Sequence, residues 1–513
     1  DVEIEYIKDN LSFLLNDKLS YDAKITNSQK TPFISISLFP FIEENGEVKR
    51  IKNISFKAVK SSSNLLEKKL KSFSNNSVLA NGSGQWYKIS IQKDGVYKLD
   101  KSFLESCGIN VDNLNPNNIR VFGNGEGRLP ELNSLFRTDD LAENLVSVYG
   151  GEDNLFNDGD YVLFYGWGPD RWYLNNDRFY NDKNIYSDYS YYYINVSEPN
   201  NVIQSTNGTD NSTYDKIITS YDYYDTHEED LYSLVGGGQR WYGELFDVEL
   251  TKVIKIEVPD VLISEPIEFD AAIASNSSSS SSTNISFSVN GTSLYSSTLP
   301  VGDFSRKSFS FQNLNPTSSF DLNVSVTRNS PTVLTYLDFI TYNCKRSLVF
   351  NNKQFNFRDI NSVGTNKKSK FIVVGQNSSF TVWDVTDKHR PLKVNGFFEG
   401  NSFNYTLETD SMREFVVFDN SSVFSPSFVS TVKNQNLHGL DQADYLIVTH
   451  KNFLDQATRL ATLHQESGLS VHVVTTEEVF NEFSSGTPDP TAIRDFVRMF
   501  YERANANNSL LPR

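Results

Sequence analysis

The sequence predicts a mainly β protein with several β-sandwich-like domains, followed by the start of a doubly wound α/β domain. The chain has 513 residues, more than a single core usually holds, so we expect about three to five domains. Aromatic residues, which favour strands, make up 13% of the chain. Alternating apolar and polar residues dominate up to about residue 440. From Asp444 onward, continuous apolar strand segments alternate with segments of helical spacing.

Charge and hydropathy exclude several kinds of partner. The net charge is −17, and the best basic cluster is the short run from Lys68 to Lys71. Neither nucleic acid nor an anionic lipid surface is therefore expected to bind through charge. No apolar run is long enough for a membrane-spanning helix. A start at Asp1, without Met or a visible signal peptide, is compatible with earlier removal of a targeting segment.

The cysteine content favours an exported bacterial chain. Cys107 and Cys344 are the two cysteines, and they lie far apart in the sequence. We expect both to be buried apolar thiols, although sequence cannot test a disulfide between them. So few cysteines in a large exported chain are typical of a bacterial surface protein rather than of a disulfide-rich scaffold.

The first predicted domain covers residues 1–83. Residues 33–39 and 51–59 alternate as strands do, and Asn45-Gly46 is typical of a hairpin turn. From residue 60 the chain becomes polar, which indicates a linker with one short helix around residues 65–70.

The second predicted domain covers residues 84–229 and is rich in β structure. Residues 86–91 and 95–99 show the pattern of a hairpin around Lys93-Asp94-Gly95. A short helix is predicted over residues 101–106, ended by Gly108. Further predicted strands are residues 119–123, 160–165 and 189–194.

Two more β regions follow. Residues 230–350 predict a sandwich, because short alternating strands are separated by Ser, Asn and Gly turns, and the Ser-rich run from Ser275 to Ser282 indicates a flexible loop. Residues 351–440 continue as strands that lead into the last domain. The clearest predicted strands are residues 285–289, 309–311, 324–326, 337–339, 371–374 and 415–418.

The last region, residues 441–513, predicts the first part of a doubly wound sheet. Residues 445–448 are continuously apolar, as in a parallel strand buried on both faces. Apolar residues then recur at helical spacing from Phe453 until Gly468 ends the helix, and residues 469–474 form a second strand. Asp489 followed by Pro490 predicts an N-cap and the first residue of another helix.

The histidines give weak candidates for a site. His450 ends the first strand of the α/β region, at the edge where such folds bind ligands. We nevertheless favour His450 as a loop or cleft-wall residue rather than as a residue with a chemical role. We expect His464 and His472 to serve packing. His389 and His438 lie in predicted loops without acidic or Cys neighbours at metal-binding spacing.

Two loops resemble ligand sites only superficially. Asp153, Asn157, Asp158 and Asp160 offer oxygens suited to calcium, but Gly159 comes one place late for an EF-hand, so a turn is favoured. The run Gly123-Asn124-Gly125-Glu126-Gly127 lacks the Lys-Ser/Thr and the helix of a phosphate loop. We therefore predict no catalytic, cofactor-binding or metal-binding residues and no cofactor.

Surface modification and glycan binding stay open. The Asn-X-Ser/Thr triplets at Asn207, Asn290 and Asn323 are expected by chance in a chain rich in Asn and Ser. Asp410-Ser411-Met412 resembles a short O-glycosylation motif of Bacteroidetes. The abundant aromatic residues would suit a carbohydrate platform if their rings were exposed, but core packing is the favoured interpretation.

Two parts of the sequence resemble a known family. Residues 444–450 and 483–496 are similar to the beginning of the gingipain family of cysteine peptidases, and the run from Gly486 to Phe496 is the most specific part. Residues 86–89, 95–99, 160–165 and 186–188 resemble the long N-terminal region of the gingipain-related sortases. These sortases belong to the type IX secretion system of Bacteroidetes.

The resemblance implies a cysteine endopeptidase and transpeptidase. A Cys thiolate, with a His as base, attacks the peptide bond before a cargo protein's C-terminal signal domain, and the cargo is then attached to anionic lipopolysaccharide. In the family these two residues follow the third and fourth strands, beyond Arg513, and neither Cys107 nor Cys344 matches the motif. We therefore expect a truncated or partial enzyme that lacks the Cys–His dyad and is inactive alone.

The resemblance also implies partners and a location. The implied partners are the outer-membrane barrel PorV, with PorZ and PorQ as further companions, and secreted cargo with C-terminal signal domains. The chain would lie on the cell surface, on the outer-leaflet side of the outer membrane, and supply scaffold and docking domains. The alternatives are a non-enzymatic adhesion or glycan-binding protein of β modules, and a separate docking chain.

Overall fold

The structure is a computed structural model that divides the chain into two compact units, Asp1–Lys71 and Ser72–Arg513. Each unit is described by itself. The residues described are 3–8, 21–28, 31–38, 41–44, 47–55, 73–80, 85–125, 127–209, 213–277, 282–376, 379–504 and 512.

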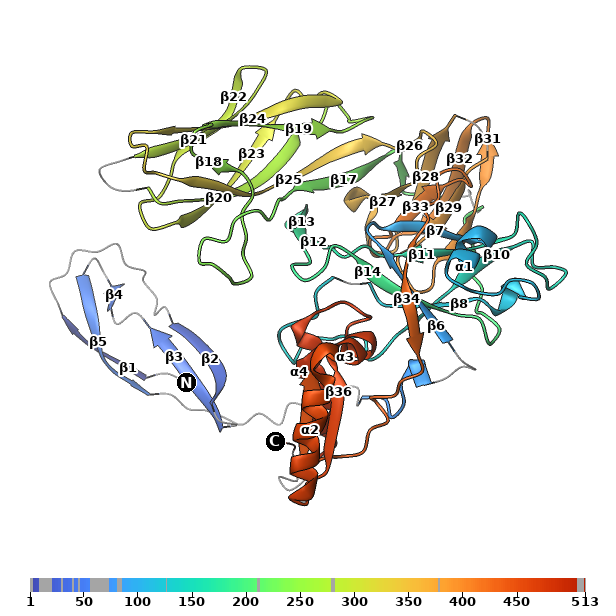
Figure 1. The fold of residues 1–513 in the computed structure, drawn as a ribbon. Helices are drawn as coiled ribbons and strands as arrows, with labels where there is room; N and C mark the ends of the chain where they lie inside the picture. Colours follow the sequence, from blue (N-terminus) through green and yellow to red (C-terminus); the bar gives the residue numbers. More distant parts are fainter. Residues whose placement is uncertain are drawn as a thin grey trace. The chain divides into compact units, whose positions relative to one another are not determined.

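The first unit contains two small antiparallel sheets, drawn in blue in Figure 1. The pairing of Glu44 with Glu47 brackets the predicted Asn45-Gly46 turn, which itself lies outside the described residues. The predicted helix around residues 65–70 and the basic run at Lys68 lie outside them as well. The sheets are β1 (Glu3–Lys8), β5 (Glu47–Ser55) and β4 (Phe41–Glu44), and the pair β2 (Tyr21–Ser28) and β3 (Thr31–Leu38).

The second unit begins with two sheets that share one core. Ile89, Leu99, Val121, Phe164 and Ile194 are buried in it. The first sheet has the order β34 (Ser427–Lys433), β6 (Gln85–Ile91), β14 (Ser190–Asn195), β8 (Arg120–Phe122), β9 (Glu143–Asn144). The second has the order β10 (Val146–Tyr149), β11 (Tyr161–Gly166), β7 (Gly95–Asp100).

Short helices connect these strands. The predicted helix is confirmed as α1 (Lys101–Ser106), in which Asp100 accepts a hydrogen bond from the Phe103 amide and Gly108 follows with φ of +81°. The 3₁₀ turns of this unit are η1 (Val78–Ala80), η2 (Pro116–Asn118), η3 (Ile360–Ser362) and η4 (Lys451–Phe453).

The predicted hairpin of residues 86–91 with 95–99 is wrong. Both segments are strands, but β6 pairs with β14 and β34, whereas β7 pairs with β11. The three residues between them carry the chain from one sheet to the other, and both strands bury apolar side chains in the core they share. Alternation predicts a strand and its buried face, but it does not specify the partner strand.

A β sandwich contains the strands predicted between residues 230 and 350. Its two antiparallel sheets enclose an apolar core that includes Phe246, Phe269, Phe287 and Leu322. One sheet has the order β17 (Ser220–His227), β25 (Thr335–Ser347), β20 (Ile267–Ser275), β23 (Ser305–Asn313), with β18 (Leu245–Phe246) beside β25. The other has the order β19 (Thr251–Glu257), β24 (Ser319–Arg328), β21 (Thr283–Val289), β22 (Thr292–Thr298). The hairpin of β12 (Arg171–Asn175) and β13 (Arg178–Asp182) lies beside it.

A second pair of sheets packs around Phe357, Phe371, Tyr405 and Phe415. Strands from the segment before β17 join both sheets in parallel. One sheet has the order β15 (Gln204–Asn207), β30 (Leu392–Asn395), β29 (Thr381–Asp384), β33 (Phe415–Phe418), β27 (Phe355–Phe357). The other has the order β16 (Lys216–Ile218), β28 (Lys368–Gly375), β32 (Ser402–Glu408), β31 (Phe397–Glu399), with β26 (Val349–Phe350) beside β28.

The chain then forms the predicted α/β region, drawn in orange and red in Figure 1. Its two strands pair in parallel from Tyr445 opposite Val471 to Thr449 opposite Thr475, as predicted. The first strand is half-buried rather than buried on both faces, since it pairs only with the second strand among the described residues. The elements are β35 (Tyr445–Thr449), α2 (Leu454–Glu466), β36 (Val471–Thr475), α3 (Thr476–Phe483) and α4 (Pro490–Arg503).

The predicted fold class, a mainly β multidomain chain that leads into an α/β region, is confirmed. No helix within the described ranges is both long and apolar enough to cross a membrane. The boundaries at residues 83, 229, 350 and 440 stay predictions.

Candidate functional site at the junction of the β scaffold and the α/β segment

Residues 484–489, the turn between α3 and α4, pack against the strands of residues 85–433, which we call the β scaffold. Lys88 on β6 is 7% exposed, and its Nζ donates to the Gly486 carbonyl at 3.0 Å and to Asn481 Oδ1 at 3.3 Å. The Tyr193 hydroxyl donates to the same Asn481 oxygen at 2.8 Å. Burial lowers the pKa of Lys88 to about 8. The scaffold therefore provides buried donors for the polar groups of α3 and the turn.

Gly486 fits this place because it has no side chain. Its φ is +86°, which L side chains rarely adopt, and a Cβ would lie 2.4 Å from Tyr193 Oη and 2.6 Å from Lys88 Nζ. The neighbouring Ser485 hydroxyl donates to the Tyr191 carbonyl at 3.1 Å and accepts from the Asn124 amide at 3.1 Å. These hydrogen bonds to backbone groups fix the turn against β14 and the loop after β8.

The start of α4 is fixed from both sides. Asp489 is 1% exposed and caps the helix, since its Oδ1 accepts from the Thr491 amide at 2.8 Å, as predicted. Its Oδ2 accepts from the Leu129 amide of the scaffold at 2.8 Å. One carboxylate therefore caps the helix and joins it to the scaffold.

The loop of residues 129–138 packs along α4. Asp495 forms a buried ion pair with Arg137. Arg494 donates to the Pro130 carbonyl at 2.8 Å, and Arg498 to the Asn133 carbonyl at 3.2 Å. The run from Gly486 to Phe496, singled out in the sequence, therefore supplies several of the contacts between the α/β segment and the scaffold.

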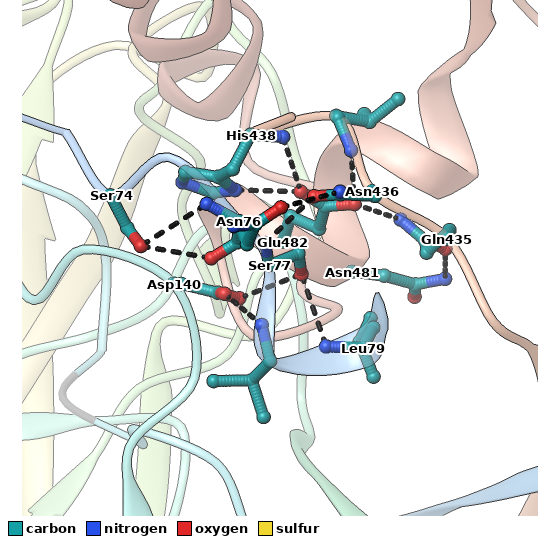
Figure 2. A network of polar contacts seen from close by, with 12 residues as sticks. Ser74, Asn76, Ser77, Leu79, Asp140, Gln435, Asn436, His438, Asn481 and Glu482 are labelled. Atoms are coloured by element: carbon teal, nitrogen blue, oxygen red, sulfur yellow. Dashed lines mark hydrogen bonds and ion pairs between the residues drawn. The ribbon is translucent and has the colours of Figure 1, made fainter. Parts of the chain in front are cut away.

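A buried ionic cluster around His438 completes the junction. His438 and Glu482 are both 0% exposed, and His438 Nδ1 lies 2.6 Å from Glu482 Oε2, as Figure 2 shows. Its Nε2 lies 3.0 Å from Asp139 Oδ1, and its ring stacks on Phe483 at 4.4 Å. Burial opposes a charged ring, but the hydrogen bonds to Asp139 and Glu482 and the charge of Asp140 outweigh it and raise the pKa of His438 to about 9.

Residues 73–80 join the same cluster. Asp140 accepts from the Ser77 hydroxyl at 3.4 Å, and burial raises the pKa of Asp140 to about 6. Arg503, in the last turn of α4, donates to the carbonyls of Ser74 at 2.6 Å and His438 at 2.7 Å. The cluster thus ties together four separate parts of the chain.

His438 has no acidic neighbours at metal-binding spacing in the sequence, but the fold places Glu482 and Asp139 beside its ring. Its partners lie 44 and 299 residues away in the sequence, so no local spacing could reveal them. The helix that carries Asn481 and Glu482, α3, was also missed. The signal for it was present, because Thr475 and Glu478 form a capping box in which each side chain bonds the other's amide.

The other histidines considered in the sequence have packing or capping contacts. His450 Nδ1 accepts from the Asn452 amide at 3.2 Å, His464 stacks on Tyr445 at 4.2 Å, and His472 donates to the Asp441 carbonyl at 2.8 Å. Burial lowers the pKa of His389, whose ring lies 5.1 Å from that of Trp167. Within the described part of the chain, no group of His, Cys, Asp and Glu is arranged to hold a metal ion.

The acidic loop before β11 is bonded internally. Asn157 donates to Asp153 at 2.8 Å and to Asp160 at 2.7 Å, while Asp158 pairs with Lys101 at 2.7 Å. These contacts are those of a turn stabilised by its own side chains.

The two cysteines lie in separate β cores. Both are free and buried, at 3% and 8% exposure. Burial raises the pKa of Cys107 to about 11 and that of Cys344 to about 12. Both groups are therefore thiols at neutral pH, whereas a nucleophile needs the thiolate.

The fold and this junction define a class of protein: a β scaffold that carries part of a cysteine-peptidase-like α/β domain. Residues 438–511 match peptidase family C25, and this stretch contains the whole turn and α4. The strands of residues 85–433 form the scaffold.

The chain is a PorU-like protein. It superimposes on the crystal structure of dimeric latent PorU from Porphyromonas gingivalis with a TM-score of 0.72 and 28% sequence identity, over 85% of this chain. The chain spans 41% of the length of that PorU chain. The predicted resemblance is thereby confirmed.

A second solved structure that matches is much less similar. A CBM36-1 domain of a xylanase from the hindgut metagenome of Trinervitermes trinervoides has 11% identity and a TM-score of 0.17, over 24% of this chain and 95% of that domain. This value carries no argument about function. No curated protein sequence matches the chain.

Proposed function

We propose that this chain is the N-terminal part of a type IX secretion sortase. In its full-length form the enzyme removes the C-terminal signal domain of secreted cargo and attaches the cargo to anionic lipopolysaccharide by Cys-dependent transpeptidation. One observation carries the proposal: the peptidase-family segment is fixed to a PorU-like scaffold through the buried contacts of Gly486, Asp489 and His438.

The role of this part is to position the peptidase domain. Acyl transfer by a thiolate requires the nucleophile, its base and the peptide bond to be held in a fixed geometry. In an α/β domain these groups are placed by the strand ends, and here the first two strands are connected to helices that the scaffold holds. The junction supplies rigidity, while neither described cysteine supplies a thiolate.

Docking and location belong to the same proposal. The scaffold would bind the outer-membrane barrel PorV, with PorZ and PorQ as further companions, on the cell surface at the outer-leaflet side of the outer membrane. Secreted cargo with a C-terminal signal domain would be the substrate of the full-length enzyme.

Two measurements test the proposal. The purified chain should show no Cys-dependent cleavage of a peptide that spans a cargo–signal-domain boundary, and iodoacetamide-sensitive turnover would contradict this.

The chain should also co-purify with PorV in detergent but not with an unrelated outer-membrane barrel. Failure to bind PorV, with the chain shown to be folded, would contradict the docking role.

A further inference from the structure

A cavity of about 390 Å³ opens in the scaffold beside the turn between α3 and α4. Ser484 and Ser485 of the turn line one side, the loop between β8 and β9 contributes a large part of the wall, and Trp172 of β12, Tyr224 of β17 and Glu414 just before β33 are among the other lining residues. Its volume lies within the roughly 300–1,000 Å³ that is usual for small-ligand sites. None of the junction contacts described above fills this cavity.

The cavity has a fixed aromatic wall. Trp172 and Tyr224 both line it, and their ring centroids lie 4.2 Å apart. The guanidinium of Arg358, which is 5% exposed, lies 4.7 Å from the Tyr224 ring centroid. Because Tyr224 is held by Trp172 and by Arg358, the wall offers a preformed apolar surface to a ligand.

Glu414 provides a charged acceptor at the wall. Its carboxylate lies 3.6 Å from Arg358 Nε and 4.0 Å from Lys388 Nζ. Both distances exceed hydrogen-bond length. Burial opposes the charge, but the two cations together hold the pKa of Glu414 below its ordinary value. Among the described residues the carboxylate accepts no hydrogen bond, so it can accept one from a ligand.

Among the described residues, the charges in and directly behind the cavity wall balance. The cations are Arg128, Arg171 and Lys388 of the lining and Arg358 behind it, and the anions are Asp94, Asp170 and Glu414 of the lining and Asp182, which pairs with both Arg128 and Arg171 at 2.7 Å. A phosphate or an ammonium group therefore gains little net attraction here, whereas a neutral ligand rich in hydroxyl groups can use both the acceptors and the donors.

We propose that this cavity binds a neutral saccharide of one or two rings. An apolar face of a sugar would lie on Trp172, and its hydroxyl groups would donate to Glu414 and Asp170. A site built from fixed polar groups around an aromatic surface favours a rigid polyhydroxylated ligand over a flexible peptide, which loses more conformational entropy on binding. This binding site lies directly beside the junction, and binding a saccharide there goes beyond the proposed positioning role.

The test is saturation-transfer NMR on the whole chain with the methyl glycosides of glucose, galactose, mannose and N-acetylglucosamine. At least one of them should bind saturably at concentrations up to about 20 mM. Glu414→Gln keeps the shape of the side chain but removes the charged acceptor, and it should weaken that binding about tenfold or more. Trp172→Ala should abolish it.

Trp241→Ala is the matched control, since Trp241 is 42% exposed and lines a different cavity. It should leave the affinity unchanged. If Trp172→Ala fails to fold, Glu414→Gln decides the outcome. The proposal is overturned if none of the four glycosides binds, if Glu414→Gln binds as the wild type does, or if the capped peptide acetyl-Ala-Tyr-Ala-amide binds in place of a sugar. None of these outcomes depends on binding to PorV or on peptidase activity.

Discussion

Several charged side chains are almost completely enclosed where the scaffold meets the α/β segment. Lys88, His438 and Glu482 are 7%, 0% and 0% exposed. Each is stabilised by groups from a distant part of the chain, and truncating either member of the His438–Glu482 pair leaves the other charge buried without its partner. Such changes typically cost about 3–5 kcal/mol. The stability of the junction should therefore depend strongly on single residues.

His438→Gln tests this at the centre of the cluster. The substitution leaves Glu482 without its cation, so we expect the free energy of unfolding to fall by about 3 kcal/mol at pH 6. The pKa of His438 is raised to about 9 in the folded chain, from an ordinary value of 6.5. Its stabilising contribution is therefore complete below pH 6.5 and is lost as the pH rises through 9. Urea unfolding at pH 6, 7.5 and 9.5 should show the difference between variant and wild type shrinking.

Other groups face the same ring, namely Asp139, Asp140 and Glu482, with Arg503 at the His438 carbonyl. Asp140 titrates near pH 6, so the comparison starts at that pH rather than below it. His464→Gln is the control, because the partly buried His464 stacks on Tyr445 and does not belong to the charged cluster around His438. A pH-independent difference between wild type and His438→Gln would contradict a charged His438.

Gly486→Ala tests the close approach of the turn. The added Cβ would lie 2.4 Å from Tyr193 Oη and would keep a φ of +86°. We expect a loss of about 2 kcal/mol or more in the free energy of unfolding. Gly468→Ala has a similar φ of +83° but nothing within 4 Å of the Cβ, so it should lose only about 1 kcal/mol from backbone strain. Equal losses in urea unfolding would show that the contact is unimportant.

At the scale of elements, α4 is the helix that joins the segment to the scaffold. Asp489 caps it and also accepts the Leu129 amide. Asp489→Ala should therefore cost about 1 kcal/mol for the cap and about 1 kcal/mol more for the lost scaffold bond. Differential scanning calorimetry measures both together.

The matched variant is Asp100→Ala. Asp100 is the N-cap of α1, where its carboxylate accepts from Phe103 and Ser102 and pairs with Lys98 at 3.6 Å. Because a solvent-accessible ion pair contributes little, a loss there reports mainly the cap. If Asp489→Ala costs no more than Asp100→Ala, the second bond of Asp489 contributes nothing to the junction.

Local sequence signals predicted most elements correctly, but not how strands pair. Asp489-Pro490 and Gly108 marked the ends of α4 and α1 where the structure has them, because caps depend on residues a few positions apart. The strands over residues 86–91 and 95–99 were also recognised, yet their pairing was not. Partner choice depends on which strands share a core, and β34 reaches β6 from more than 300 positions away.

At the scale of the whole molecule, neither described cysteine can serve as the nucleophile of a peptidase. Burial keeps both thiols protonated, with pKa values of about 11 and 12. The folded chain should therefore react with Ellman's reagent at pH 8 far more slowly than the chain in urea, which should release two equivalents of thiolate product per chain. Rapid labelling of the native chain would contradict the burial of both groups. Cys107→Ser and Cys344→Ser assign any reactive thiol to its position.

The sequence alone determined the class of this protein, because strand alternation, helix caps and the run from Gly486 to Phe496 are written in neighbouring residues. The tertiary structure decided what that run does. Its glycine, aspartates and single arginine bind scaffold groups that lie about 360 to 400 positions away. The same is true of His438, whose charge depends on Asp139 and Glu482 meeting it in a buried place. Such contacts arise only when the chain is folded, since burial and distance in space set the energy of a charge.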